Sequence, residues 1–88
     1  MIIDYSISFP ADAHVVVVLG DARHSLRQLA SKVRCTKTWC TYLFTELDVL
    51  ELRRDRCKVV VQKPNMSIYE MTCKEFIEYM EWLNGEET

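Results

Sequence analysis

The chain has 88 residues, which fits one domain spanning residues 1–88 and excludes a two-domain enzyme. Hydrophobic residues make up 49% of the chain and charged residues 27%, and it has only 2 glycines and 2 prolines, a globular rather than a disordered or fibrous composition. The 11 Lys and Arg against 13 Asp and Glu leave a formal net charge of −2, too small to indicate nucleic-acid or membrane binding by itself.

The N-terminal residues and the cysteines bear on the compartment. No basic region precedes an apolar stretch, and the longest apolar run, Val15 to Leu19, is far shorter than the roughly 18 residues that cross a bilayer. We therefore expect a cytoplasmic protein with no membrane contact. Because the cytosol is reducing and the spacing does not form two tight pairs, the sequence predicts buried free thiols and no metal at Cys35, Cys40, Cys57 and Cys73.

The first half of the chain suggests two strands and a helix. Residues 2–9 alternate between apolar and polar, as in a strand with one solvent-facing side. Residues 14–19 are a β-branched run that predicts a strand buried on both faces, and a hairpin is the simplest pairing of the two. A helix is predicted over residues 22–34, capped by Asp21 or Ser25.

The middle of the chain leaves alternatives open. Residues 36–45 are rich in Thr and aromatic residues, which favours extended structure, although Trp39, Leu43, Leu47 and Leu50 also fit a helical stripe. Residues 49–52 and 57–62 predict a hairpin with a charged tip at 53–56.

The end of the chain predicts a second helix over residues 73–84. Thr72 and Glu75 have the spacing of a capping box at its start. Its apolar side is predicted to face the core and contains Phe76, Tyr79, Met80 and Leu83. The predicted architecture is a single α+β domain of order ββαβββα, an antiparallel sheet with two helices on one face.

No catalytic or cofactor motif is present, so we expect a non-enzymatic protein without a cofactor. A lone glycine at Gly20 lacks the spacing of a phosphate-binding turn, and an ordinary turn is the simpler interpretation. His24 and Cys35 could form a nucleophile pair only if they were in contact, which their spacing does not indicate.

Basic residues concentrate in two places. Arg23, Arg27 and Arg34 would form a stripe along the first predicted helix. With the basic residues of the predicted tip, the stripe could contact phosphates or an acidic protein, or simply form a solvated face. The residues of the tip are Arg53, Arg54, Arg56 and Lys58.

Trp82 is predicted to lie on the outer side of the last helix, among Glu75, Glu78 and Glu81. Tryptophan often dominates the binding energy of protein interfaces when it fills a pocket of the partner. The alternatives are that Trp82 packs against a loop of its own chain or against a second copy in a homodimer.

These features favour a small cytoplasmic protein-binding regulator, an inhibitor or adaptor of a larger protein, a class that includes phage-encoded examples. The residues predicted to contact the partner are Trp82, Glu75, Glu78, Arg23, Arg27 and Arg34. The alternative is nucleic-acid binding by the arginine stripe and the basic tip.

Overall fold

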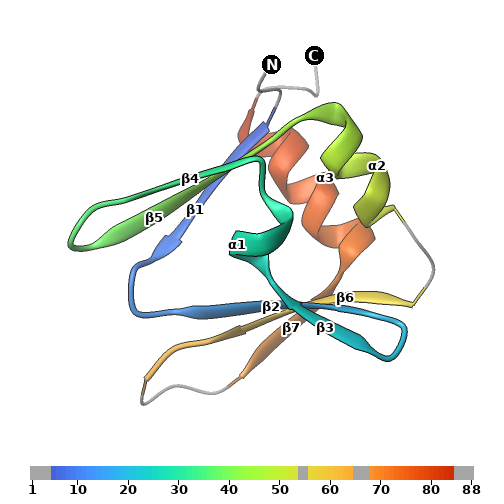
Figure 1. The fold of residues 1–88 in the computed structure, drawn as a ribbon, viewed down its shortest axis with the longest axis horizontal. Coiled ribbons are helices and arrows are strands. Elements are labelled where there is room, and N and C mark those ends of the chain that lie inside the picture. Colours follow the sequence, from blue (N-terminus) through green and yellow to red (C-terminus); the bar gives the residue numbers. More distant parts are fainter. Residues whose placement is uncertain (1–4, 54–55, 65–67, 85–88) are drawn as a thin grey trace.

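The computed structural model describes residues 5–53, 56–64 and 68–84 of the chain. They form two antiparallel sheets and three helices, so the predicted α+β class is confirmed, although the strands divide into two sheets instead of one (Figure 1). Sheet A contains, in spatial order, β1 (Tyr5–Pro10), β5 (Trp39–Phe44) and β4 (Lys32–Cys35). Sheet B contains β3 (Ala22–Ser25), β2 (His14–Leu19), β6 (Cys57–Gln62) and β7 (Tyr69–Thr72).

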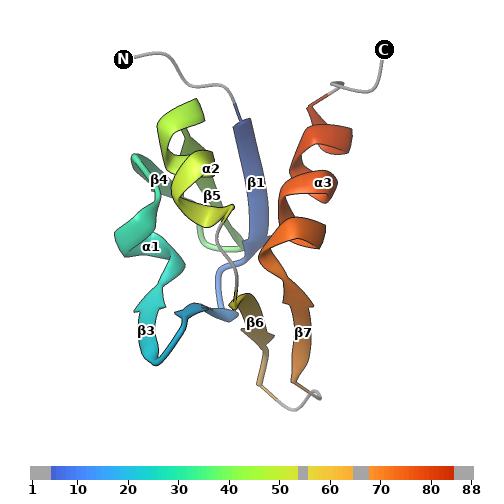
Figure 2. The same ribbon diagram turned by 90° about the vertical axis from the view of Figure 1, so that its right-hand side faces the viewer.

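Three helices accompany the sheets: α1 (Leu26–Leu29), α2 (Glu46–Leu52) and α3 (Cys73–Leu83). In Figure 2, β1 lies between α3 on one side and α1 and α2 on the other. The longest described helix, α3, has 11 residues, and none of the described helices is both long and apolar enough to cross a membrane.

The first two strands belong to different sheets, so the predicted hairpin between residues 2–9 and 14–19 is wrong. β1 pairs along its whole length with β5, whereas β2 pairs with β3 and β6. Consecutive strands are neighbours in most proteins, but here β1 and β2 each pair with strands further along the chain. Only one side of β2 is fully buried, because Val15 and Val17 lie in the core while Val16 and Val18 are half-buried.

The helix predicted over 22–34 is wrong, since the structure divides these residues among β3, α1 and β4. Gly20 and Asp21 form the tight turn of a hairpin in which Leu19 lies opposite Ala22. Gly20 has a φ of +61°, in the left-handed region that such turns require and that glycine adopts without strain. Pairing with β2 therefore uses the residues that would have started a long helix.

Only a short part of the predicted helix is observed, as α1. Ser25 and Gln28 form the predicted capping box, in which the Ser25 hydroxyl accepts a hydrogen bond from the Gln28 backbone N–H. Leu26 is buried, but the chain is extended again at Ala30, so α1 has only 4 residues.

The stretch that the sequence left open contains a strand followed by a helix. β5 is the central strand of sheet A, and α2 begins after Thr45, which forms a capping box with Asp48. The strand predicted over 49–52 is therefore wrong, because these residues belong to α2, where Val49 and Leu52 are buried. The strand predicted over residues 57–62 is confirmed as β6.

The last helix begins and ends close to the predicted residues. The Thr72 side chain accepts a hydrogen bond from the Glu75 backbone N–H at 3.1 Å, and the Glu75 carboxylate accepts one from the Thr72 backbone N–H at 2.9 Å. This reciprocal pair is the predicted capping box, and it satisfies two backbone N–H groups that would otherwise lack a partner.

This capping box makes the stability of the fold depend on pH. The hydrogen bonds from the Thr72 backbone and hydroxyl to the Glu75 carboxylate lower the pKa of Glu75 from its ordinary value of 4.5. A lowered folded-state pKa stabilises the folded chain above pH 4.5, and this contribution is lost as the pH falls through the lower value. We expect Glu75→Gln to flatten the fall in melting temperature on the acid side, measured by circular dichroism. An acid-side fall as steep as that of the unmodified chain would contradict the lowered pKa.

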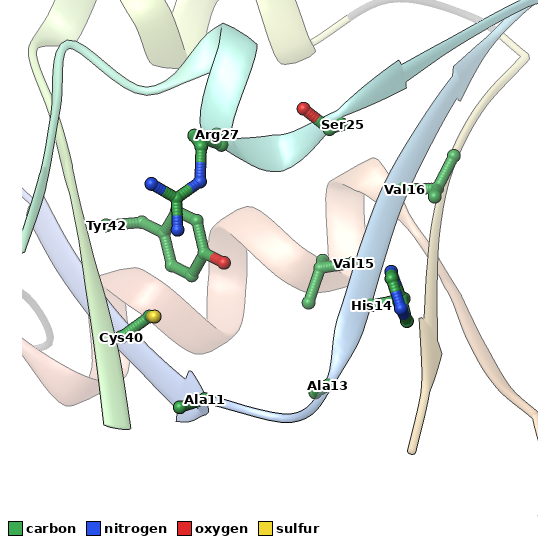
Figure 3. A pocket seen from close by; sticks show the side chains of 9 residues that line it. All are labelled: Ala11, Ala13, His14, Val15, Val16, Ser25, Arg27, Cys40 and Tyr42. Atoms are coloured by element: carbon green, nitrogen blue, oxygen red, sulfur yellow. The ribbon is translucent and has the colours of Figure 1, made fainter. Parts of the chain in front are cut away.

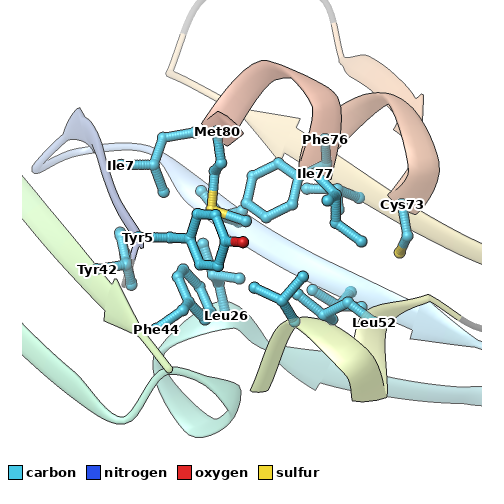
Figure 4. Packing of buried hydrophobic residues seen from close by; sticks show 14 of the residues in the cluster. Tyr5, Ile7, Leu26, Tyr42, Phe44, Leu52, Cys73, Phe76, Ile77 and Met80 are labelled. Atoms are coloured by element: carbon cyan, nitrogen blue, oxygen red, sulfur yellow. The ribbon is translucent and has the colours of Figure 1, made fainter. Parts of the chain in front are cut away.

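The inner faces of both sheets and the helices enclose one hydrophobic core. In Figure 4, Phe76, Ile77 and Met80 extend from α3 into this core. The ring of Phe76 is fully buried, with its centroid 6.4 Å from those of both Phe9 and Phe44. The contacts of Phe76 thus hold α3 against sheet A.

The cysteines form two disulfides, Cys35–Cys40 and Cys57–Cys73, so the prediction of free thiols is wrong. Cys35 lies opposite Cys40 in the pairing of β4 with β5, and the second bond joins the first residue of β6 to the first residue of α3. Three of the four positions are buried as predicted, and Cys35 is exposed. Cysteine spacing carries no information on pairing until strand register is known, so the sequence did not reveal either bond.

Candidate functional site

Three large side chains lie exposed together on the outer side of α3. Trp82 is 63% exposed, Tyr79 47% and Leu83 45%. The rings of Tyr79 and Trp82 stack with their centroids 6.2 Å apart and 23° between their planes. Leu83 follows Tyr79 by four residues, which places the two side by side on a helix. We call Tyr79, Trp82 and Leu83 the aromatic patch.

The exposure of Trp82 was predicted, but Tyr79 and Leu83 were predicted to face the core, which is wrong. The buried side of α3 is rotated by about 60° from the predicted one, calculated from 3.6 residues per turn. The disulfide from Cys73 to β6 draws the first turn toward sheet B, and Ile77 follows on the same side. The side chains buried from α3 are those of Cys73, Phe76, Ile77 and Met80.

Both ends of α3 are attached to the rest of the fold, so the aromatic patch has a defined position. The start is fixed by the disulfide to β6, and the end is fixed by Asn84. The Asn84 side-chain amide donates to the Ser6 carbonyl at 3.1 Å and to the Met80 carbonyl at 2.7 Å, and its oxygen accepts from the Ser6 backbone N–H at 3.3 Å. Ser6 lies on β1, an edge strand, so these bonds also occupy part of a free sheet edge.

Two acidic side chains border the aromatic patch. Glu78 is exposed and precedes Trp82 by four residues, and Glu75 is exposed and precedes Tyr79 by four. The capping box holds the Glu75 carboxylate toward Thr72, so its charge has a fixed place at the start of α3. The patch is therefore an apolar surface with a negative rim.

The arginine stripe predicted for the first helix is wrong, because that helix does not form. Arg23 lies on β3, Arg27 on α1 and Arg34 on β4, each of them exposed. Arg23 lies opposite Val18 on the outer face of sheet B, and Arg34 lies on the outer face of sheet A. The two sheets turn their inner faces to the shared core, so these two arginines point away from each other.

Arg53 and Arg56 of the predicted basic tip lie between α2 and β6. The Arg53 guanidinium is 3.7 Å from the Glu81 carboxylate, and the Arg56 guanidinium is 3.8 Å from that of Asp21. Exposed ion pairs of this kind contribute little stability, but they reduce the free positive charge of Arg53 and Arg56. The other two residues of the predicted tip are Arg54, outside the described residues, and Lys58, exposed on β6.

The described residues give no support to the catalytic or metal sites that the sequence suggested only weakly. Cys35 is bonded to Cys40 and cannot act as a nucleophile with His24. Gly20 belongs to a hairpin turn and not to a strand-to-helix turn, so no helix N-terminus follows it to receive a phosphate. Within residues 5–53, 56–64 and 68–84, no group of three or more His, Cys, Asp or Glu side chains is placed to hold a metal ion.

Comparison with known proteins found no match to a protein-family model, a curated protein or a solved structure. The function is therefore inferred from the geometry of the chain itself.

Proposed function

We propose that this chain is a non-enzymatic protein-binding regulator, an inhibitor or adaptor that inserts the aromatic patch of α3 into an apolar pocket of a larger protein. The observation that carries this proposal is the stacked pair of Tyr79 and Trp82, both about half exposed or more on a helix whose opposite side is buried. Soluble domains rarely expose large apolar groups together unless the surface binds something.

The patch has the properties of an interface centre. Tryptophan and tyrosine are the residues most enriched among those that dominate binding energy. Because Tyr79 and Trp82 already stack on each other, less rotational freedom remains to be lost when a partner covers them. The core side of α3 is anchored by other residues, so contact with a partner does not compete with folding.

The charge around the patch indicates the chemistry of the partner. Glu75 and Glu78 would lie at the edge of the contact, where solvent remains and opposite charges guide association. We therefore expect an apolar pocket bordered by lysine or arginine.

Nucleic-acid binding is the second candidate, and one feature of sheet A favours it. Its outer face carries Lys32, Arg34 and Trp39, all exposed, beside the hydroxyl groups of Ser8 and Thr41. Basic and aromatic side chains along one groove or face are typical of proteins that bind single-stranded nucleic acid. This face replaces the predicted stripe and tip as the surface for that function.

The cytoplasmic location stays a prediction, and the two disulfides argue against it. Structural disulfides persist in oxidising environments and are rare in the cytosol. The protein-binding proposal does not depend on the compartment, because the aromatic patch contains no cysteine.

Site-specific photo-crosslinking tests the proposal. Trp82→p-benzoylphenylalanine places a crosslinker in the patch, and Leu47→p-benzoylphenylalanine places it on α2, where Leu47 is 74% exposed. In extracts of the native host, position 82 should crosslink to one protein species that position 47 does not reach.

The other outcomes separate the alternatives. Crosslinking of position 82 to a second copy of the chain would replace the proposal with a homodimer. Retention of nucleic acid that is lost in Lys32→Ala and Arg34→Ala variants, without any protein crosslink at position 82, would favour the second candidate. Equal crosslinking from positions 82 and 47 would contradict a specific patch.

A further inference from the structure

A cavity of about 270 Å³ lies between the two sheets, where the chain crosses from β1 to β2 (Figure 3). The turn after β1, the start of β2, α1 and the central strand β5 all contribute to its lining. The groups that matter for binding are apolar ones from Ala13, Val15 and Cys40 and polar ones from Arg27 and Tyr42. None of the lining residues is acidic.

Tyr42 provides a hydroxyl without a partner. Its side chain is only 6% exposed, and Figure 3 shows the hydroxyl directed into the cavity. Within the described part of the chain this hydroxyl makes no hydrogen bond. Every fully buried polar side-chain atom of that part does have a hydrogen-bond partner, so the Tyr42 oxygen is not fully buried. The oxygen must therefore open onto the cavity. The ring itself is fixed, with Phe9 at its edge at a centroid distance of 6.0 Å.

Arg27 provides a positive charge at the same place. Its guanidinium extends from α1 toward the cavity, and its Nη2 atom donates to the sulfur of Cys35 at 3.3 Å (Figure 3). Sulfur is a weak acceptor and does not neutralise the charge. No carboxylate of the described residues lies within ion-pair distance of Arg27. Among the described residues this exposed cation therefore has no counterion, and most of its five N–H donors bind none of them.

We infer that this cavity binds a small organic carboxylate, with the carboxylate held between the Arg27 guanidinium and the Tyr42 hydroxyl. A guanidinium matches the two oxygens of a carboxylate, and a phenol hydroxyl donates to the same group. The apolar wall formed by Ala13, Val15 and Cys40 would receive the rest of the ligand.

The size and charge of the cavity narrow the ligand class. A cavity of roughly 150 Å³ is enough to bind benzene, so 270 Å³ accommodates a carboxylate attached to a single ring or a short branched chain. One guanidinium balances a single negative charge, which favours a monocarboxylate over a multiply charged phosphate. A metal cation has no anionic side chain in the lining to bind it.

Titration of the oxidised full-length chain with benzoate tests the inference, because benzoate carries one carboxylate on one ring. Benzamide is the matched neutral probe, and inorganic phosphate is the competing anion. Followed by two-dimensional NMR, benzoate should shift the backbone signals of Val15, Arg27 and Tyr42, while benzamide and phosphate at the same concentration should not.

Three variants connect the binding to the proposed groups. Arg27→Gln and Tyr42→Phe should each weaken benzoate binding by about tenfold or more, since each removes a hydrogen bond to a charged group. Tyr42→Phe keeps the ring in place, and unchanged NMR spectra elsewhere would show that the fold is intact. Arg34→Gln, an exposed arginine on the outer face of sheet A, is the control and should leave the affinity unchanged.

Several results would overturn the inference. These are the absence of benzoate shifts at millimolar concentration, equal binding of benzamide, preferential binding of phosphate, or an equal loss of affinity in Arg34→Gln. None of these measurements involves the aromatic patch, so failure here is distinct from failure of the protein-binding proposal.

Discussion

Replacing Phe76 with alanine should lower the free energy of unfolding by about 3 to 5 kcal/mol, the range typical of removing a buried aromatic ring. The Phe76 ring is fully buried, and its centroid is 6.4 Å from that of Phe9 and 6.4 Å from that of Phe44. Alanine would leave a cavity at the point where α3 meets sheet A. Because a domain of this size has only about 5 to 15 kcal/mol of stability, the substitution would remove a large fraction of it. Urea denaturation followed by circular dichroism measures the change.

Leu47→Ala is the control for that prediction. Leu47 is a large apolar residue on α2 that is 74% exposed, so its truncation should change the free energy of unfolding by less than about 0.5 kcal/mol. If Phe76→Ala were no more destabilising than Leu47→Ala, the assignment of the buried side of α3 would be wrong.

Removing the Cys57–Cys73 disulfide should have the second largest effect. The bond closes a loop between residues 16 positions apart, and the chain-entropy relation gives a loss of about 3 kcal/mol when it is removed. Both sulfurs are buried and fix the first turn of α3 against β6. The double variant Cys57→Ala/Cys73→Ala therefore loses both the crosslink and part of the core packing. Chemical denaturation of the oxidised protein measures the loss.

The other disulfide provides the matched comparison. Cys35 and Cys40 are separated by 5 residues, and removing that crosslink should cost only about 2 kcal/mol by the same relation.

Thiol titration of the denatured, unreduced chain should find no free thiol. Four reactive thiols in that titration, or a larger loss from the Cys35→Ala/Cys40→Ala variant, would contradict this account.

The sequence predicted where individual strands and helices lie along the chain better than it predicted which strands pair with each other. Alternating residues identified β1, the β-branched run identified β2, and a capping box with helical periodicity identified α3. These signals are local, since they depend on residues within a few positions of each other. The pairing of β1 with β5 depends on contacts between residues that are 29 to 39 positions apart, and no local pattern encodes them.

The error at residues 22–34 shows how tertiary pairing overrides a local pattern. The apolar residues there have helical spacing, and Ser25 with Gln28 does start a helix. However, the turn at Gly20 returns the chain along β2, where backbone hydrogen bonding makes the residues of β3 extended. Gly20 followed by Asp21 is a signal for this turn, but the same two residues also fit the end of a strand before a helix.

The candidate site was partly predictable. The exposure of Trp82 followed from its position among glutamates. The observed orientation of α3 agrees with that prediction, because Trp82 lies about 170° from the centre of the buried side by the 3.6-residue period. Tyr79 was assigned to the core because the phase of an amphipathic helix has an uncertainty of about one residue in a sequence pattern. The cavity at Arg27 and Tyr42 is lined by residues from β2, α1 and β5, so it could not be found without the fold.

The most direct test of the protein-binding proposal is to measure partner affinity and thermal stability together in two tryptophan variants. Once crosslinking at position 82 has identified the partner, the dissociation constant is compared for the unmodified chain, Trp82→Ala and Trp39→Ala. Trp39 is the matched control because it is 51% exposed on sheet A, away from the aromatic patch.

We expect Trp82→Ala to weaken partner binding by at least about thirtyfold, equivalent to about 2 kcal/mol or more, with a nearly unchanged melting curve. Trp39→Ala should leave the dissociation constant unchanged. A melting temperature that falls in Trp82→Ala as far as it does in Phe76→Ala, or equal affinities in the two tryptophan variants, would contradict the claim that the aromatic patch is the binding surface.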